Sequence, residues 1–141
     1  MRHRVKSIKL GRTSQHRDSM LANLVISLIR HKRIQTTIAK AKAVKPLAEK
    51  MVTLGKKGDL AARRLAMTRL GSSDAVKQLF SDLAPLFKER RGGYTRIIKI
   101  GHRKTDAAPM ALLEWTETSS GNKPKLEKTN KKAAISEEKK T

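Results

Sequence analysis

Apolar residues recur at helical spacing in the first part of the chain. Between residues 14 and 31 they fall every three or four positions, with polar residues on the opposite side, which predicts an amphipathic helix. The apolar stripe consists of Met20, Leu21, Leu24, Val25, Leu28 and Ile29. Thr13 or Ser14 can cap this helix, and Asp18 lies near its first turn, where negative charge is favoured.

A short β-branched run and a second helical pattern follow. Residues 34–38 (Ile-Gln-Thr-Thr-Ile) favour a brief strand or a turn. Thr37 can cap the next helix. The predicted core face of that helix is Val44, Leu47, Ala48, Met51 and Val52. Pro46 lies inside this pattern, so it predicts either a kink or the true start of the helix.

Glycine, aspartate and serine divide the middle of the chain. The run Gly-Lys-Lys-Gly at 55–58 ends the second helix, Asp59 caps a third, and Gly71 stops it. The predicted apolar stripe of the third helix is Ala62, Leu65, Ala66 and Leu70. Ser72 or Ser73 begins a fourth helix, and Pro85 restarts the chain towards Phe87. The apolar residues of the fourth helix are Val76, Leu79, Phe80 and Leu83.

The last patterned segment alternates at strand spacing. Gly92 and Gly93 break the helix and open a strand at 94–100, and a polar loop at 101–109 leads to a second strand at 110–115. We expect the two strands to pair antiparallel and to pack on the helices, because a lone hairpin is marginally stable. The predicted fold class is α+β, with four or so helices packed on a small β-sheet that includes a C-terminal hairpin.

Charge divides the 141 residues into three regions. The net charge is +21, and residues 1–48 hold twelve Lys and Arg against a single acid, Asp18. Residues 1–12 contain no acid and few apolar residues, so we expect an extended basic N-terminal arm that becomes ordered on its partner. Residues 13–117 form the predicted globular domain. Residues 118–141 are rich in Lys, Glu, Ser and Thr, and their apolar residues recur at neither helical nor strand spacing. This composition predicts a disordered tail.

The charge excess indicates a polyanionic partner. Repulsion among like charges disfavours the compact state unless a polyanion neutralises it, and nucleic acid is the obvious candidate. The chain has no cysteine, no apolar run near the roughly 18 residues of a membrane span, and no apolar stretch behind its first charges. We therefore expect a soluble cytoplasmic protein without a membrane partner.

The sequence lacks the groups that catalysis requires. Its acids are dispersed, and the one adjacent pair, Glu137 and Glu138, lies in the predicted tail. The four histidines lack the i, i+4 spacing of a helical zinc pair. The sequence contains no Walker-type phosphate loop. We expect no enzyme activity, no metal, no cofactor and no small-molecule substrate.

Clustered cations are the motifs that remain, and they favour binding to structured RNA, because arginine binds phosphate bidentately and stacks on bases. The first predicted cluster is the arm with the start of the first helix: Arg2, His3, Arg4, Lys6, Lys9, Arg12, His16 and Arg17. The second set lies further along the chain: Arg63, Arg64, Arg91, Tyr94, Arg96, Arg103 and Lys104.

Two residues of the second set allow sharper expectations. Phe80, Phe87 and Trp115 fit core positions, which leaves Tyr94 as the one candidate to stack on a base. Arg96 has two interpretations. It can pair with phosphate, or its aliphatic stem can cover the core, because strand alternation places it on one face with Tyr94, Ile98 and Ile100.

Several short motifs resemble one known family. They are Met1-Arg-His-Arg4, Arg12-Thr-Ser-x-His-Arg17, Ile34-x-Thr-Thr37 leading into Lys40-Ala-Lys42, Arg63-Arg-Leu-Ala66, Arg91-Gly-Gly-Tyr-Thr-Arg96 and Ala108-Pro-Met-Ala111. In this order they resemble the bacterial large-subunit (50S) ribosomal protein numbered seventeen. The resemblance implies a non-enzymatic α+β protein that binds 23S rRNA near the polypeptide exit, beside neighbouring large-subunit proteins. It covers residues 1 to about 116, so nothing carries over to the tail.

Two other functions fit parts of the sequence. A DNA-architectural protein is equally basic, but such proteins often insert apolar wedges into the minor groove, and the sequence shows no obvious exposed wedge. An RNA-processing enzyme would need catalytic groups, and we find no candidates for them. Structural binding of rRNA by phosphate neutralisation and shape recognition is the function that the sequence favours.

Overall fold

The computed structural model describes residues 8–117. The elements run in the order α1 (Ser14–His31), β1 (Arg33–Thr37), α2 (Ile38–Lys57), α3 (Leu60–Leu70), α4 (Ser73–Gln78), the π-helical turn η1 (Leu79–Leu83), α5 (Ala84–Leu86), β2 (Thr95–His102) and β3 (Pro109–Trp115). Helices and a small sheet thus share one fold, which confirms the predicted α+β class. The predicted tail and the first seven residues of the arm lie outside the described residues.

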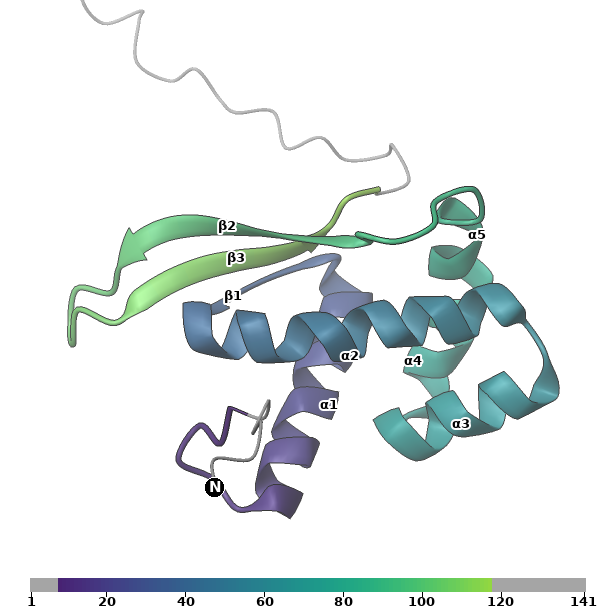
Figure 1. Ribbon diagram of the computed structural model, residues 1–141, viewed down its shortest axis with the longest axis horizontal. Coiled ribbons are helices and arrows are strands. Elements are labelled where there is room, and N and C mark those ends of the chain that lie inside the picture. Colours follow the sequence, from purple (N-terminus) through teal and green to yellow (C-terminus); the bar gives the residue numbers. More distant parts are fainter. Residues whose placement is uncertain (1–7, 118–141) are drawn as a thin grey trace, which may run out of the picture.

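The three strands form one antiparallel sheet in the order β1-β3-β2. The predicted pairing of β2 with β3 is confirmed. Of residues 34–38, for which the sequence allowed a strand or a turn, residues 34–37 belong to β1, which pairs with the other edge of β3, and Ile38 begins α2. Helices α1 to α4 lie on one side of this sheet, with α2 running along it, and α5 lies beyond the end of the strands (Figure 1). The β2–β3 hairpin extends past the start of α2, and its other face carries no helix.

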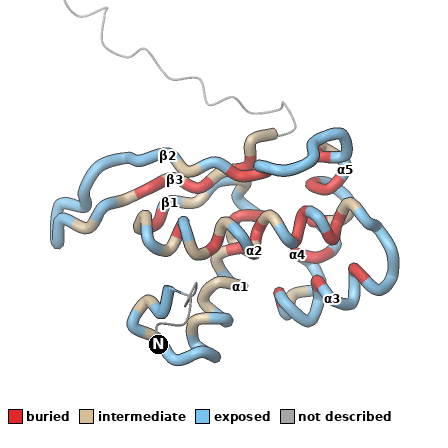
Figure 2. Tube along the Cα trace, viewed as in Figure 1, coloured by how far each residue is buried: buried red, intermediate tan, exposed pale blue. Residues whose placement is uncertain are grey.

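Strand β3 is central, and its residues alternate between the two faces of the sheet. Ala111, Leu113 and Trp115 are buried, because they face the helices, and the intervening residues face outward. Figure 2 shows the buried segments of β3 and α2 facing one another, while the end of the hairpin is exposed. The hydrophobic core therefore lies between the sheet and the helices.

Local capping signals set both ends of α3, the end of α2 and the start of α4 as predicted, but not the starts of α1 and α2. Asp59 Oδ1 accepts the backbone N–H of Ala62 at 2.8 Å and starts α3. Gly58 and Gly71 adopt φ of 72° and 66°, and this left-handed conformation, which costs glycine little, ends α2 and α3. Ser72 caps α4 by accepting the N–H of Ala75. Thr13 and Thr37 occupy the N-cap positions of α1 and α2 without a side-chain hydrogen bond.

Pro46 does not mark the start of α2, so that alternative was wrong. The helix begins at Ile38 and continues through Pro46 to Lys57. Pro46 is exposed, so the carbonyl that its missing N–H leaves unpaired can be hydrated. Packing of the buried face, which includes Ala41 and Val44, holds both sides of the proline in one helix. Tertiary burial therefore outweighs the local cost of proline.

Three further expectations need correction. Leu65 was assigned to the buried stripe of α3 but is 41% exposed, because only Ala62, Ala66 and Leu70 of that helix reach the core. Pro85 does not restart the chain, since η1 leads directly into α5. The arm was expected to be extended, but residues 9–12 form a turn in which the Arg12 N–H bonds the Lys9 carbonyl at 3.2 Å.

Candidate nucleic-acid interface

The described part of the arm holds its cations on a folded turn. Leu10 and Gly11 have φ of 55° and 64°, and this conformation reverses the chain just before α1. The guanidinium of Arg12 donates to the Leu10 carbonyl at 2.8 Å, and Arg17 donates to the Arg12 carbonyl at 3.4 Å. These bonds hold both side chains near the start of α1, while Lys9 is exposed. The remaining predicted arm residues, Arg2, His3, Arg4 and Lys6, lie outside the described residues.

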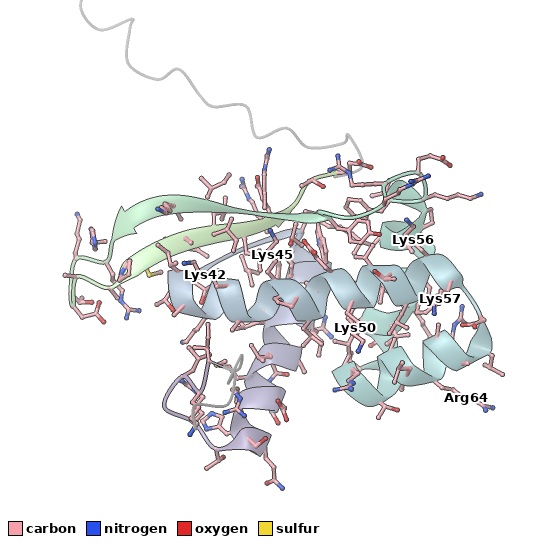
Figure 3. The ribbon with its side chains drawn as sticks, in the orientation of Figure 1. Lys42, Lys45, Lys50, Lys56, Lys57 and Arg64 are labelled. Carbon is pink, nitrogen blue, oxygen red and sulfur yellow. The ribbon has the colours of Figure 1, made fainter. Side chains whose placement is uncertain are left out.

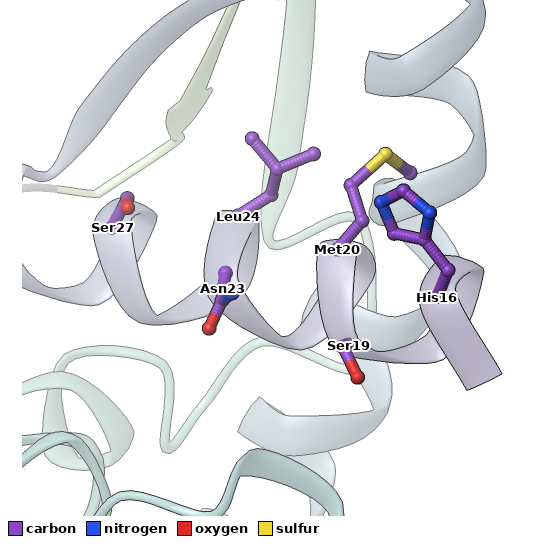
Figure 4. Close-up of a pocket in the computed structure, with 6 residues that line it drawn as sticks. All are labelled: His16, Ser19, Met20, Asn23, Leu24 and Ser27. Atoms are coloured by element: carbon purple, nitrogen blue, oxygen red, sulfur yellow. The ribbon is translucent and has the colours of Figure 1, made fainter.

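His16 borders a shallow hollow along α1. The hollow has a volume of about 330 Å³, and it is lined by His16, Ser19, Met20, Asn23, Leu24 and Ser27. Figure 4 shows that the polar residues Ser19, Asn23 and Ser27 follow one another along the helix, beside the row of His16, Met20 and Leu24. No acid lines the hollow, and the described residues contain no group of three His or acidic side chains that could hold a metal. This surface offers hydrogen-bonding groups but no catalytic or metal-binding set.

Arg63 and Arg64 are exposed on α3. The guanidinium of Arg63 lies over the ring of Phe80, 5.1 Å from its centroid, so a cation–π contact holds it. Figure 3 shows Arg64 extending away from the helix into solvent. One of the two predicted arginines is therefore held against the protein, and the other is open to a partner.

Tyr94 is not available to stack on a base, so its predicted role was wrong. The residue is 4% exposed, and its ring packs edge-on against Phe87 with centroids 5.2 Å apart. Its hydroxyl accepts a hydrogen bond from Lys56 Nζ at 3.4 Å. Tyr94 precedes the first residue of β2, so strand alternation does not determine its direction. Phe87, seven residues earlier, and Lys56 of α2 hold the ring in the core.

Arg96 lies on the outer face of the sheet and forms an ion pair with Glu114 of β3. Its side chain is 61% exposed, and Ile98 and Ile100 are exposed as well. The alternative in which the Arg96 stem covers the core is therefore wrong. The neighbouring Arg91 is exposed. Arg96 keeps the access to solvent that phosphate binding needs, but Glu114 competes for its charge.

Arg103 is also paired, at the tip of the hairpin. Its Nε and Nη2 donate to the two carboxylate oxygens of Asp106 at 2.8 and 2.7 Å. These hydrogen bonds, with the N–H of Ala108, lower the pKa of Asp106 to about 2, and the same contact raises the pKa of Arg103. Lys104 is exposed beside them and has no ion-pair partner among residues 8–117.

The predicted cations do not meet at one point. The described cations of the arm lie beside the start of α1. Helix α3, which carries Arg63 and Arg64, lies at the far end of the helical layer, and the hairpin tip projects from the opposite side (Figure 1). The hairpin also exposes apolar side chains, since Ile98 is 42% and Ile100 52% exposed. The expectation of no exposed wedge was therefore wrong. A surface that presents separate basic regions suits a large polyanion better than a small ligand.

One group of exposed cations was not singled out by the sequence interpretation. Lys42, Lys50 and Lys57 are exposed on α2. Lys42 belongs to one of the family motifs, but none of the three was predicted as a binding residue. Plotting residues 38–57 on a helix of 3.6 residues per turn places the three lysines together. That periodicity, applied to the polar positions, would have found them.

In fold and charge the described chain is a basic α+β protein with separate basic surfaces and no cluster of His and acidic side chains that could hold a metal. None of its described helices is long and apolar enough to cross a membrane. The family model for ribosomal protein L17 matches residues 20–116. The chain therefore belongs to the ribosomal protein L17 family, whose members are structural proteins of the ribosome and not enzymes.

Relatives from several bacteria support this assignment. Large ribosomal subunit protein bL17 of Thermodesulfovibrio yellowstonii is 50% identical over 133 residues, which cover 94% of this chain and 99% of that protein. The protein of the same name from Methylacidiphilum infernorum is 54% identical and covers 83% of this chain and 89% of its own length. The protein of the same name from Desulfitobacterium hafniense is 59% identical over 106 residues, which cover 75% of this chain and 95% of that protein.

Proposed function

We propose that this chain is a structural component of the bacterial large ribosomal subunit in the cytoplasm. It binds 23S rRNA near the polypeptide exit and contacts neighbouring large-subunit proteins. The observation that carries this proposal is the 50% identity over nearly the whole of a relative named for that subunit. The net charge of +21 supports RNA as the partner, because assembly would relieve the repulsion among like charges.

The physical basis of binding is phosphate neutralisation and recognition of folded RNA. The basic regions are spread over several elements, and the one tyrosine is buried. Recognition through rows of stacked bases is therefore not supported. Contacts from Lys9, Arg64, Arg91 and Lys104, all exposed, would instead follow the shape of the sugar–phosphate backbone.

Sedimentation of a tagged protein in a cell lysate tests the assignment directly. We expect the protein to migrate with large ribosomal subunits and to leave them only in high salt, because the contacts are electrostatic. The exposed isoleucines of the hairpin favour one rival, a DNA-architectural protein that inserts apolar wedges. Migration with the nucleoid, and loss of that migration after DNase treatment, would support the rival and contradict our proposal.

Deletion of residues 2–9 tests the role of the arm. The described core begins at Val25, and Ile8 is 48% exposed, so the deletion removes cations and little apolar packing. We expect circular dichroism to retain the helical signal and incorporation into subunits to fall sharply. Loss of the helical signal would show that the arm is part of the folded core.

Truncation after Glu117 tests the proposed domain division. We propose that residues 13–117 form the binding domain and that residues 118–141 are a solvated tail, because they carry no periodic apolar face. The truncated protein is expected to incorporate into subunits as the full chain does. Failure to incorporate would identify the tail as a binding element.

A further inference from the structure

Helix α2 presents one fully exposed row along its length. Positions 42, 46, 50, 53 and 57 recur every three or four residues, so they share one side of the helix. They are Lys42, Pro46, Lys50, Thr53 and Lys57, and all five are exposed. We call the three lysines of this row the α2 ridge. Figure 3 shows labelled lysines along the whole length of α2, from Lys42 near its start to Lys57 at its end.

Helix α2 carries too few acidic residues to pair with its lysines on its own surface. The helix contains six lysines and a single acid, Glu49. Glu49 is already engaged, since Lys45 lies 4.0 Å away and the Thr95 hydroxyl donates to it at 3.2 Å. Solvated helices usually alternate the two signs, because Glu–Lys pairs at i, i+4 stabilise them. No member of the ridge has an ion-pair partner among residues 8–117, so the ridge is open to an external anion.

The ridge is held rigidly by the opposite face of the same helix. Ala48, Met51 and Val52 are fully buried, and α2 contacts β1, β2, β3, α1 and α3. From Lys42 to Lys57 the helix advances about 22 Å, at about 1.5 Å per residue. One strand of duplex DNA carries a phosphate about every 3.4 Å along its axis, and at a spacing of that order the ridge is long enough to follow several consecutive phosphates.

Small side chains separate the lysines of the ridge. Pro46 and Thr53 occupy the intermediate positions, and the Thr53 hydroxyl is turned back to the Glu49 carbonyl at 3.0 Å. A sugar–phosphate backbone that lies along α2 would therefore contact short side chains between three long cationic ones. A lysine ammonium binds phosphate as a point charge without a strict geometry. Such contacts suit recognition of the phosphate backbone, which does not depend on the base sequence.

We propose that the α2 ridge binds the sugar–phosphate backbone of one strand of RNA, as a contact separate from those of the arm, α3 and the hairpin. The proposal rests on the proposed function, because it requires RNA as the partner. Of the three lysines, the family motifs contain only Lys42, so the motifs do not identify the ridge as a surface. Two measurements on the whole chain test it.

The first measurement is the salt dependence of binding to 23S rRNA transcribed in vitro. The ridge variant Lys42→Gln with Lys50→Gln keeps helix propensity, since Gln and Lys are similar in this respect. Lys57 is left unchanged because a cation in the last turn also stabilises the helix dipole. Lys77→Gln with Lys88→Gln is the matched control, because both lysines are exposed outside α2 and the variant removes the same charge.

We expect the ridge variant to flatten the log–log slope by about 1.4 to 1.8, which corresponds to two lost phosphate contacts, and the control to leave the slope unchanged. Equal changes in both variants would show a general charge effect and overturn the proposal. If the unaltered protein itself fails to bind the rRNA, the proposed function fails instead, so the two failures are distinguishable.

The second measurement is protection of lysines from acetylation, read by mass spectrometry. In complexes with 23S rRNA alone we expect Lys42 and Lys50 to be protected relative to the free protein, while Lys77 stays reactive. Protection only in complete subunits would mean that a neighbouring protein covers the ridge, which would contradict RNA as its occupant. Unchanged reactivity in both complexes would also overturn the proposal.

Discussion

The indole Nε1 of Trp115 donates a hydrogen bond to the backbone carbonyl of Leu28 at 3.0 Å. Leu28 lies in the last turn of α1, where carbonyl groups have no partner within the helix. The last residue of β3 thus supplies a donor to the C-terminus of α1, and the Trp115 N–H reinforces this link by donating to the Lys32 carbonyl at 3.3 Å. Both residues of the indole bond are buried, so it joins two distant parts of the chain inside the core.

Replacing Trp115 with Phe should lower the free energy of unfolding. The variant keeps an aromatic ring but leaves the buried Leu28 carbonyl without its indole donor, and an unsatisfied buried group costs about 1–3 kcal/mol. Urea unfolding followed by circular dichroism would measure the loss. An unchanged midpoint would show that water or another donor replaces the indole.

Gly55→Ala should also destabilise the protein, although alanine favours helices. A Cβ at this position of α2 would lie 2.8 Å from the Cβ of Ala84, and overpacking costs about 1–3 kcal/mol, which exceeds the gain of about 1 kcal/mol in helix propensity. Thermal unfolding of Gly55→Ala, Ala84→Gly and the double variant forms a cycle. We expect the double variant to recover part of the loss, and strictly additive effects would contradict a clash between these two residues.

The hairpin tip should lose its ion pair only in strong acid. Because the pKa of Asp106 is about 2, its ionised form is favoured in the folded state. The stabilisation is complete above its ordinary value of 3.8 and is lost as the pH falls through about 2. A carboxyl-detected NMR titration would give the midpoint, and Arg103→Gln should return it towards the ordinary value. A midpoint near 4 in the unaltered protein would contradict the bidentate contact.

Glu114→Gln should strengthen binding to rRNA by releasing Arg96. The carboxylate of Glu114 holds the Arg96 guanidinium in an ion pair, and a freed guanidinium can add a phosphate contact, which steepens the log–log salt slope by up to about one unit. Filter binding at several salt concentrations would measure this slope.

Glu89→Gln is the control for that variant, because it makes the same charge change at an exposed residue without an ion pair in the described part of the chain. We expect Glu89→Gln to leave the slope unchanged. The same steepening in both variants would show that total charge, and not competition for Arg96, controls binding.

The sequence by itself determined the features that depend on neighbouring residues. Asp59 caps α3 and Gly71 ends it, because a cap and a left-handed glycine act within one turn of the helix. The hairpin of β2 and β3 follows from strand alternation on either side of a polar loop, and the excess of cations in the first 48 residues follows from counting. These signals are local, so no knowledge of the fold is needed to interpret them.

Only the tertiary structure decided which of these residues are open to a partner. Tyr94 is buried and bonded by Lys56 of α2, although the sequence presented it as free to stack on a base. Arg96 is paired with a carboxylate on the neighbouring strand, which neither of its two interpretations anticipated. Residues 33–37 become a strand because β3 offers them an edge, and α2 continues through Pro46 because its opposite face is buried. Each outcome depends on groups that are distant in sequence and that meet only when the chain folds. Periodicity and propensity, which describe neighbouring residues, therefore cannot predict it.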